Sequence, residues 1–197
     1  GDHFRREVKT RLNRALALRR VLLSPKINAG EVGPNSFRLV FGESDFLPGL
    51  IVDLFESSGR GPVAVAQCHA AGADMFLPVL AEWVEKDLGG SALVVRNDLD
   101  VRSREKVEQF TETFGVLPAR TYASEGGVEF EISALKGLKT GYFYDLREHR
   151  GRFAEVMSQQ KGILLDCFSY IGSWGLQALK KNAKLELLAV DISKSAL

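Results

Sequence analysis

The apolar positions along the chain predict one long helix at the start, followed by a run of short strands. From residue 4 to residue 23 apolar side chains recur near the helical period, which predicts an amphipathic helix over Phe4–Leu23. The next segment, Pro25–Asn35, contains two prolines and two glycines. Residues of these kinds interrupt regular structure, so residues 1–35 are predicted to be a helix and a linker.

Short apolar runs separated by turn-rich stretches then predict four strands and one helix. The strands are predicted at Phe37–Phe41, Leu50–Phe55, Val63–Cys68 and Ala92–Arg96. A helical pattern covers Asp74–Leu88 and is closed by Gly89 and Gly90. This order of elements predicts a small α+β central domain over residues 36–121, built on an antiparallel sheet.

The segment after this domain has little periodicity. Val101–Thr121 is charged and irregular, so we interpret it as a joint between domains. Val128–Ile132 alternates like a strand, and Gly151–Gln160 has a helical pattern. Residues 122–197 are therefore assigned to a second domain.

The second domain contains a predicted β-α-β unit. Its parts are a strand at Ile163–Asp166, a loop at Cys167–Ser173, a helix at Trp174–Ala183 and a strand at Leu185–Asp191. In such a unit the loop opens onto a helix N-terminus, which suits a polar or anionic ligand. Asp191 lies about twenty residues beyond that loop, where a carboxylate can accept hydrogen bonds from both ribose hydroxyls of an adenosine. The unit therefore predicts a nucleoside site, with an unliganded Rossmann-like core unit as the alternative.

The loop residues favour one nucleoside cofactor over others. A pyrophosphate needs glycines at the first two positions of G-x-G-x-x-G, so that backbone amides can approach it closely. Gly172 and Gly175 are present, but Tyr170 stands at the leading position, where it would crowd a diphosphate. S-adenosylmethionine has no phosphate and needs one close backbone approach, which Gly172 can supply. The loop therefore favours S-adenosylmethionine over NAD or FAD.

Composition narrows the setting without naming a ligand. The chain has 197 residues, 45% of them hydrophobic, which is ample for a core, and its net charge of +1 exerts no global attraction on nucleic acid. The two cysteines have no neighbours at metal-ligand spacing and fit a reducing, cytoplasmic setting. No apolar run approaches the ~20 residues of a membrane helix, and no signal-peptide pattern is visible. We therefore expect no membrane partner.

One local patch of charge could meet an anionic surface. The predicted first helix carries a strongly basic face on which Glu7 is the only acid. Arg11, Arg14 and Arg19 on this face are candidates for contacts with RNA. A solvated face without a partner is the alternative.

Two motifs resemble a known enzyme family. They are Lys139-Thr140-Gly141-Tyr142-Phe143-Tyr144-Asp145-Leu146-Arg147 and Asp166-Cys167-Phe168-Ser169-Tyr170-Ile171-Gly172. With Arg38–Val40, Glu43–Asp45, Leu47–Gly49 and Ile51–Asp53, they resemble the 23S ribosomal RNA cytosine-5 methyltransferases that carry an N-terminal PUA domain. The resemblance implies an α+β central domain followed by the beginning of an α/β Rossmann-like methyltransferase domain. It further implies methyl transfer from S-adenosylmethionine to carbon 5 of a cytosine in ribosomal RNA.

The resemblance also assigns residues to the cofactor. It implies that the first motif packs over the cofactor and that the second forms the turn beneath it. Thr140 and Gly141 offer a hydroxyl and a bare backbone, while Asp145 and Arg147 suit the amino group and the carboxylate of the donor. The cofactor-binding residues of the turn are Asp166, Cys167, Phe168, Ser169 and Gly172, and Asp191 beyond the turn joins them. The alternative is that Asp145 and Arg147 pair with each other.

The chain departs from the family at three positions: Leu146, Ile171 and Ser173 replace the usual glutamine, threonine and glycine. These changes put the substrate and full activity in question. The two open alternatives are a non-catalytic RNA-binding accessory protein and a methyltransferase of this fold that acts on protein or a small molecule. No oligomeric state is assigned, a dimer being one option.

Carbon-5 methylation of cytosine needs a thiolate nucleophile. We do not assign Cys167 to this role, because the resemblance implies a nucleophilic cysteine in a later motif, beyond Leu197. Cys68 is expected to be a small buried hydrophobe. None of the three histidines is assigned to catalysis or to a metal.

The chain is expected to be a fragment without the PUA domain. Its last residues, 193–197, stand where a helix would begin, after two parallel strands. We therefore expect exposed apolar edges on the Rossmann-like unit and no turnover by these residues alone.

Overall fold

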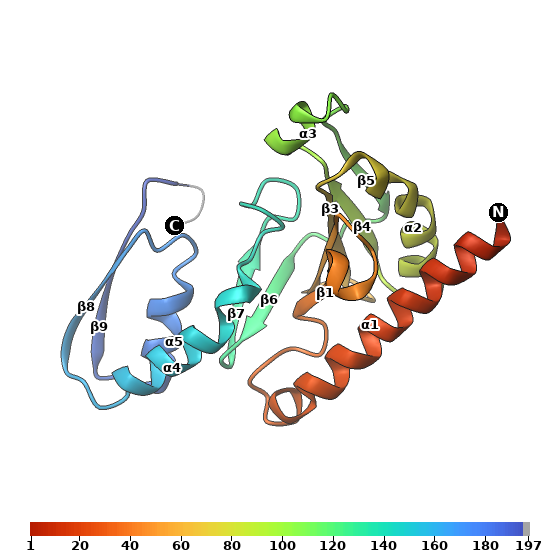
Figure 1. The fold of residues 1–197 in the computed structure, drawn as a ribbon. Coiled ribbons are helices and arrows are strands. Elements are labelled where there is room, and N and C mark those ends of the chain that lie inside the picture. Colours follow the sequence, from red (N-terminus) through yellow and green to blue (C-terminus); the bar gives the residue numbers. More distant parts are fainter. Residues whose placement is uncertain (195–197) are drawn as a thin grey trace.

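A computed structural model describes residues 1–194, so the expected helix start at residues 193–197 lies mostly outside the described part. The chain forms a seven-stranded mixed sheet with helices on one face, and a separate two-stranded sheet near the C-terminus (Figure 1). This mixed α/β arrangement agrees with the predicted fold class. Within the described residues, no helix is both long and apolar enough to cross a membrane.

The first helix is longer than predicted. Helix α1 covers Asp2–Asn28 and contains Pro25, so the prediction of a loop from Pro25 was wrong for its first four residues. A proline lacks the amide that would bond to the carbonyl four residues earlier. Here the Ser24 hydroxyl donates to that Val21 carbonyl at 3.0 Å, which satisfies the acceptor and lets the helix continue.

The central sheet has the strand order β5-β4-β3-β2-β6-β7, and β1 pairs with the same edge of β2 as β6 does. The strands are β1 (Phe37–Phe41), β2 (Leu50–Ser57), β3 (Val63–Cys68), β4 (Ala92–Arg96), β5 (Thr111–Gly115), β6 (Thr121–Glu125) and β7 (Val128–Ile132). Short 3-10 helices cover Gly42–Asp45 and Ala71–Phe76, and helix α2 covers Leu77–Lys86. The four strands predicted for the central domain are confirmed.

Two expectations about this sheet were wrong. The sheet is not wholly antiparallel, because α2 connects β3 to β4 as a crossover and these two strands are parallel. Val101–Thr121 is not an irregular joint, since it contains helix α3 (Asp100–Arg104) and β5, which pairs with β4. Strand β5 lies at the sheet edge and is mostly exposed, so its sequence shows little hydrophobic alternation.

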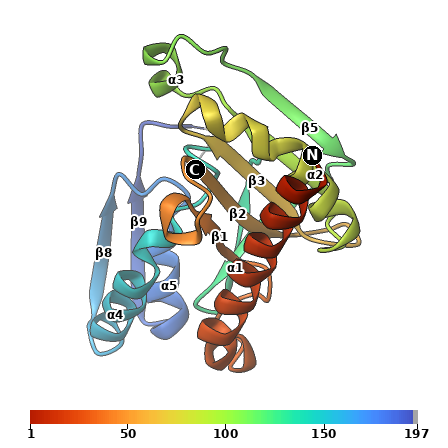
Figure 2. The same cartoon turned by 45° about the vertical axis from the view of Figure 1, so that its right-hand side comes forward.

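The core lies on both faces of the central sheet. On one face α1 and α2 pack against the strands, with Leu12, Leu54 and Trp83 fully buried. On the other face Phe55 and Val65 contact Tyr142 and Tyr144. Figure 2 shows α1 running across the sheet, and Lys26 in its last turn pairs with Glu148 on α4.

The C-terminal elements form the predicted β-α-β unit. Strands β8 (Gly162–Cys167) and β9 (Leu185–Val190) are parallel and are connected by α5 (Ser173–Lys181), against which α4 (Arg147–Met157) packs (Figure 2). A short 3-10 helix, Tyr144–Leu146, leads into α4. The division at residue 121 remains a prediction, because β6 and β7 pair with the central sheet rather than with β8 and β9.

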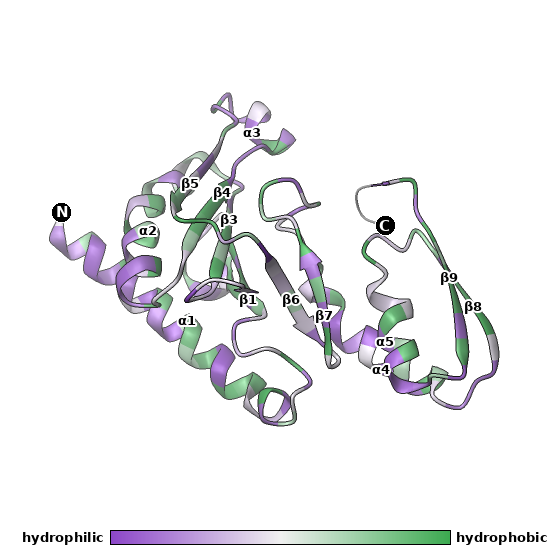
Figure 3. Cartoon of the chain, turned by 180° about the vertical axis from the view of Figure 1, so that it is seen from behind, coloured by the Kyte–Doolittle hydropathy of each residue, from purple (hydrophilic) through white to green (hydrophobic). Residues whose placement is uncertain are grey.

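The face of the β8–β9 sheet that points away from α5 exposes apolar side chains, as expected. Ile163, Leu165, Leu188 and Val190 are between 48% and 70% exposed. Figure 3 shows hydrophobic colouring along both strands.

Candidate functional site

Two carboxylates mark the ends of the parallel strands β8 and β9. Asp166 lies near the end of β8, and its Oδ2 accepts a hydrogen bond of 3.1 Å from the Gly175 amide on α5. Asp191 follows β9, where its Oδ1 accepts from the Ser193 amide and its Oδ2 from the Tyr170 amide, each at 2.8 Å. The hydrogen bonds from the Ser193 and Tyr170 amides lower the pKa of Asp191 below its usual value. Asp191 is therefore charged and oriented at neutral pH.

The loop between β8 and α5 has a strained backbone. Phe168 and Tyr170 have φ angles of 61° and 51°, a region that residues with side chains rarely adopt, and Gly172 has a φ of 69°. Lys139, in the neighbouring segment, has a φ of 53°. Backbone strain of this kind persists where the surrounding structure enforces it and clusters at functional sites.

One buried hydroxyl in this loop has no partner. Ser169 is 3% exposed, and its Oγ makes no hydrogen bond in the described structure. A buried polar atom usually has a partner, so an unsatisfied one is a candidate ligand contact. This is the single observation within the loop that points directly to a missing binding partner.

A hollow of about 410 Å³ lies beside the loop. Its walls include Ile132 on β7, Lys136 and Leu138 in the following segment, and Tyr170 and Ile171 in the loop. Tyr170 joins the two walls, since its hydroxyl accepts from the Leu138 amide and donates to the Gly141 carbonyl, each at 3.2 Å. The structure thus brings the two sequence motifs together.

Thr140 and Gly141 are held by the central sheet. The Thr140 hydroxyl donates to the buried carboxylate of Asp53, which also accepts from the Nε and Nη2 of Arg38 at 2.8 and 2.9 Å. Gly141 has a φ of 119°, and a Cβ there would lie 3.0 Å from Ile132 Cδ1. These contacts fix the first motif against β2 and β7.

Arg147 does not pair with Asp145, as the alternative interpretation would require. Its Nε donates to Glu125 Oε2 at 3.1 Å, and its Nη2 donates to the Ser36 carbonyl. Asp145 is exposed to solvent. The structure therefore does not bring Arg147 to the loop after β8, and the cofactor role of both residues remains a prediction.

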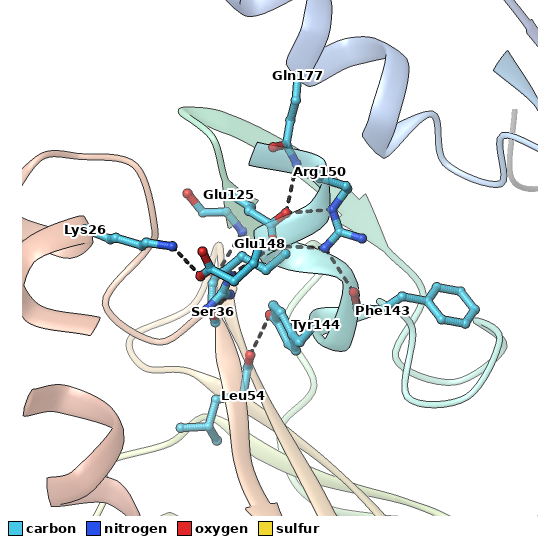
Figure 4. A network of polar contacts seen from close by, with 11 residues as sticks. Lys26, Ser36, Leu54, Glu125, Phe143, Tyr144, Glu148, Arg150 and Gln177 are labelled. Atoms are coloured by element: carbon cyan, nitrogen blue, oxygen red, sulfur yellow. Dashed lines mark hydrogen bonds and ion pairs between the residues drawn. The ribbon is translucent and has the colours of Figure 1, made fainter. Parts of the chain in front are cut away.

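Glu125 is the centre of a polar network at the joint between the sheets (Figure 4). It accepts from Arg150 at 2.6 and 3.0 Å and from Gln177 at 2.9 Å. Burial raises the pKa of Glu125, but hydrogen bonds and charges, chiefly from Arg150, outweigh this effect and hold the pKa below its usual value. Sequence reasoning missed this network, although β6 buries alternate residues and Glu125 occupies one of those inward positions.

The two cysteines have different surroundings. Cys68 is fully buried in β3, and burial raises the pKa of its thiol to about 12, which confirms the expected structural role. Cys167 is exposed at the end of β8, beside Phe168, which is 90% exposed. Among residues 1–194, no group of three or more histidine, cysteine, aspartate or glutamate side chains could hold a metal ion.

The basic face of α1 is partly engaged within the chain. Arg11 donates to Glu7 at 3.1 Å and to the Phe46 carbonyl at 2.6 Å. Arg19 forms a two-pronged ion pair with the buried Asp45, while Arg14 lies over the Phe46 ring at 5.8 Å. The predicted contact of Arg11, Arg14 and Arg19 with RNA remains untested, and Arg19 has little exposed surface to offer.

Two sequence relatives of this chain share one name. No family model matches the chain. Ribosomal RNA large subunit methyltransferase I of Aliivibrio fischeri is 34% identical over 192 residues, covering 95% of this chain and 44% of that protein. The protein of this name from Pseudoalteromonas translucida is 34% identical over 198 residues, covering 100% of the chain and 46% of that protein. The chain spans less than half the length of these relatives.

Solved structures show the fold. A protein from Streptococcus mutans described as a SAM-dependent methyltransferase matches 94% of the chain and 46% of its own length, with a TM-score of 0.61 and 17% identity. A methyltransferase complexed with SAH matches 95% of the chain and 46% of its own length, with a TM-score of 0.66 and 14% identity. The chain is therefore similar in sequence to part of ribosomal RNA large subunit methyltransferase I, and it has the mixed α/β fold of the corresponding part of SAM-dependent methyltransferases.

Proposed function

We propose that this chain belongs to an enzyme that transfers a methyl group from S-adenosylmethionine to ribosomal RNA, at carbon 5 of a cytosine. The observation that carries the proposal is the arrangement of Asp166 and Asp191 at the ends of two parallel strands, with the strained loop between them. Ligands in parallel α/β sheets bind outside the carboxyl ends of the strands, where this loop lies. The names of the sequence relatives support ribosomal RNA as the substrate class.

The residues present fit the cofactor. Each Asp191 oxygen accepts one backbone hydrogen bond and has capacity for another, so the carboxylate can bind both ribose hydroxyls. Within the described part of the chain, Ser169 supplies a hydroxyl without a partner, Gly172 a turn without a side chain, and Asp166 an oxygen that accepts no hydrogen bond. When bound, S-adenosylmethionine supplies an electrophilic methyl group on a sulfonium.

The remaining proposed cofactor contacts differ in how much side-chain movement each would need. Cys167 and Phe168 are exposed at the start of the loop and are accessible to a ligand as they stand. Gly141 lets the segment above the loop lie close to Ile132, and Thr140 anchors this segment through Asp53. Asp145 is exposed, whereas Arg147 would have to leave Glu125 before it could bind the cofactor carboxylate.

Calorimetric titration of the natural full-length protein with S-adenosylhomocysteine tests the proposal. Asp191→Ala removes an acceptor for two hydroxyls, and hydrogen bonds to charged groups contribute about 1.5–3 kcal/mol each, so we expect affinity to fall about tenfold or more. The affinity of the Asp191→Asn protein, which keeps the shape of the side chain, should fall less. Asp87→Ala is the matched control, since Asp87, directly after α2, is an exposed acid that pairs with Lys9 at 3.1 Å.

Absence of binding by the natural protein would contradict the proposal and favour an RNA-binding protein without catalysis. Equal affinities for the Asp191→Ala and Asp87→Ala proteins would show that the cofactor does not lie at Asp191.

A further inference from the structure

The face of the central sheet opposite α1 and α2 is divided into an apolar part and a polar part. Phe55 and Val65 belong to the apolar part, which Tyr142 and Tyr144 cover. Side chains alternate along a strand, so Ile51 on β2, four positions from Phe55, and Gln67 on β3, two positions from Val65, continue the same face. Gln67 is still buried there, since its Nε2 donates to the Lys139 carbonyl at 3.2 Å, whereas Ile51 is only half-buried.

A second hollow of about 440 Å³ lies over this polar part. We name it the basic groove and define it by Arg38, Phe41, Arg96, Lys136 and Lys139, which line it together with other residues. Among all the lining residues Asp98 is the only acid. The groove therefore gathers cations from β1, β4 and the segment that precedes Thr140.

The cations of the basic groove are of two kinds. Arg38 is paired with the buried Asp53, and Arg96 is paired with Asp98 and also donates to the Gly137 carbonyl at 3.0 Å. Lys136 and Lys139 are exposed and have no acidic partner among residues 1–194. Each of these two ion pairs is neutral, so the two lysines leave the groove with a net positive charge.

An exposed aromatic ring lies at the edge of the basic groove. Phe41 ends β1 and is 53% exposed, and the Arg38 guanidinium carbon lies 5.7 Å from the centre of its ring. Exposed rings on sheets are platforms on which unpaired bases stack, while nearby cations hold the phosphates. A base-paired helix would not present its base faces to such a ring.

The basic groove shares part of its wall with the hollow beside the loop after β8, our candidate cofactor hollow. Lys136, Gly137 and Leu138 line both. We propose that the basic groove binds a single-stranded segment of RNA, with a base on Phe41 and phosphates at Lys136 and Lys139. This inference rests on the proposed methyltransferase function and deepens it, since the bound strand leads towards the loop after β8.

The basic face of α1 is the competing surface. Arg11 and Arg19 there are tied to Glu7, Phe46 and Asp45, so they hold α1 to the structure beside it. Arg14 beside the 58% exposed Phe46 forms a smaller cation and ring pair. This pair offers matched control substitutions for the groove.

Binding of a short fluorescein-labelled single-stranded RNA of mixed sequence, measured by fluorescence anisotropy at several salt concentrations, tests the groove. For the Lys136→Gln/Lys139→Gln protein, we expect the slope of log affinity against log salt to fall by about 0.7 for each lost phosphate contact. Phe41→Ala should weaken binding by about fivefold or more at every salt concentration, and Phe41→Trp should restore it, because stacking needs a ring. Arg14→Gln and Phe46→Ala should change neither quantity.

The outcomes separate this inference from the proposed function. If the groove variants bind RNA like the natural protein, or if Arg14→Gln and Phe46→Ala weaken binding instead, the groove is not the RNA surface. Titration of Phe41→Ala with S-adenosylhomocysteine should give the natural affinity, since Phe41 does not line the cofactor hollow. If the groove substitutions abolish RNA binding but the natural protein does not bind S-adenosylhomocysteine, the groove is supported and methyl transfer is contradicted.

Discussion

Arg150 on α4 donates a hydrogen bond of 2.6 Å from its Nε to Oε1 of Glu125 on β6, and both side chains are at most 3% exposed. Glu125 also binds Arg147 and accepts from Gln177 on α5 (Figure 4). One carboxylate therefore connects the central sheet to both helices that support the β8–β9 unit. The position of the strained loop relative to the first motif depends on this connection.

Glu125→Gln should destabilise the protein strongly. The substitution leaves two guanidinium groups buried without a counter-charge, and loss of one partner from a buried ion pair costs about 3–5 kcal/mol. The free energy of unfolding from denaturant titration measures this effect. Glu155→Gln is the control, because Glu155 pairs with Lys181 on the surface and is 71% exposed. Equal stabilities of the two variants would contradict a structural role for the network.

The same network should make stability depend on acid pH. The pKa of Glu125 is lower in the folded protein than the ordinary value of 4.5. A carboxyl group of this kind contributes stability that is present above its unfolded pKa and is lost as the pH falls through its folded pKa. We expect the difference in unfolding free energy between the natural protein and Glu125→Gln to shrink below about pH 4.5. A constant difference down to strongly acid pH would show that the charge of Glu125 does not matter.

Two glycines in helices should respond in opposite directions to alanine. A Cβ at Gly175 in α5 would lie 2.4 Å from Leu187 Cδ1, so Gly175→Ala should cost about 1–3 kcal/mol through overpacking against β9. Gly151 in α4 has open space, so Gly151→Ala should stabilise by about 0.5–1 kcal/mol through helix propensity. Thermal unfolding of the two variants checks both signs. A stabilising Gly175→Ala would mean that α5 and β9 pack less closely than described.

Thr140→Val should loosen the first motif. The substitution keeps the shape but removes the hydroxyl that donates to Asp53, and a hydrogen bond to a charged group contributes about 1.5–3 kcal/mol. Thr140→Ser should recover most of this free energy of unfolding. If valine and serine behave alike, the hydrogen bond to Asp53 contributes nothing measurable.

The two cysteines should react with iodoacetamide at very different rates. Cys167 is exposed, whereas Cys68 is buried and has a thiol pKa of about 12, so it lacks the reactive thiolate at neutral pH. Mass spectrometry of labelled peptides should find Cys167 modified and Cys68 unmodified in the folded protein. S-adenosylhomocysteine should slow labelling of Cys167, and unchanged labelling at saturation would place the cofactor away from this residue.

Much of the local structure was predictable because periodicity is a local property. The strands Phe37–Phe41, Val63–Cys68 and Ala92–Arg96 have the predicted bounds, since each is a short, mainly apolar run. The edge strand Thr111–Gly115 was not predictable in this way, because exposure on an edge removes the hydrophobic signal. Hydrophobic periodicity also does not reveal the continuation of α1 through Pro25, where the Ser24 hydroxyl donates to the Val21 carbonyl.

The sequence by itself determined the β-α-β unit and the identity of the residues in its loop, because strand, helix and turn preferences act over a few neighbouring residues. Only the tertiary structure decided which distant groups meet. It placed Arg147 on Glu125 rather than on Asp145, and it bound Thr140 to Asp53 across 87 positions of sequence. A charged or polar side chain that leaves water must find a partner somewhere in the fold, and the nearest partner in space has no fixed separation along the chain.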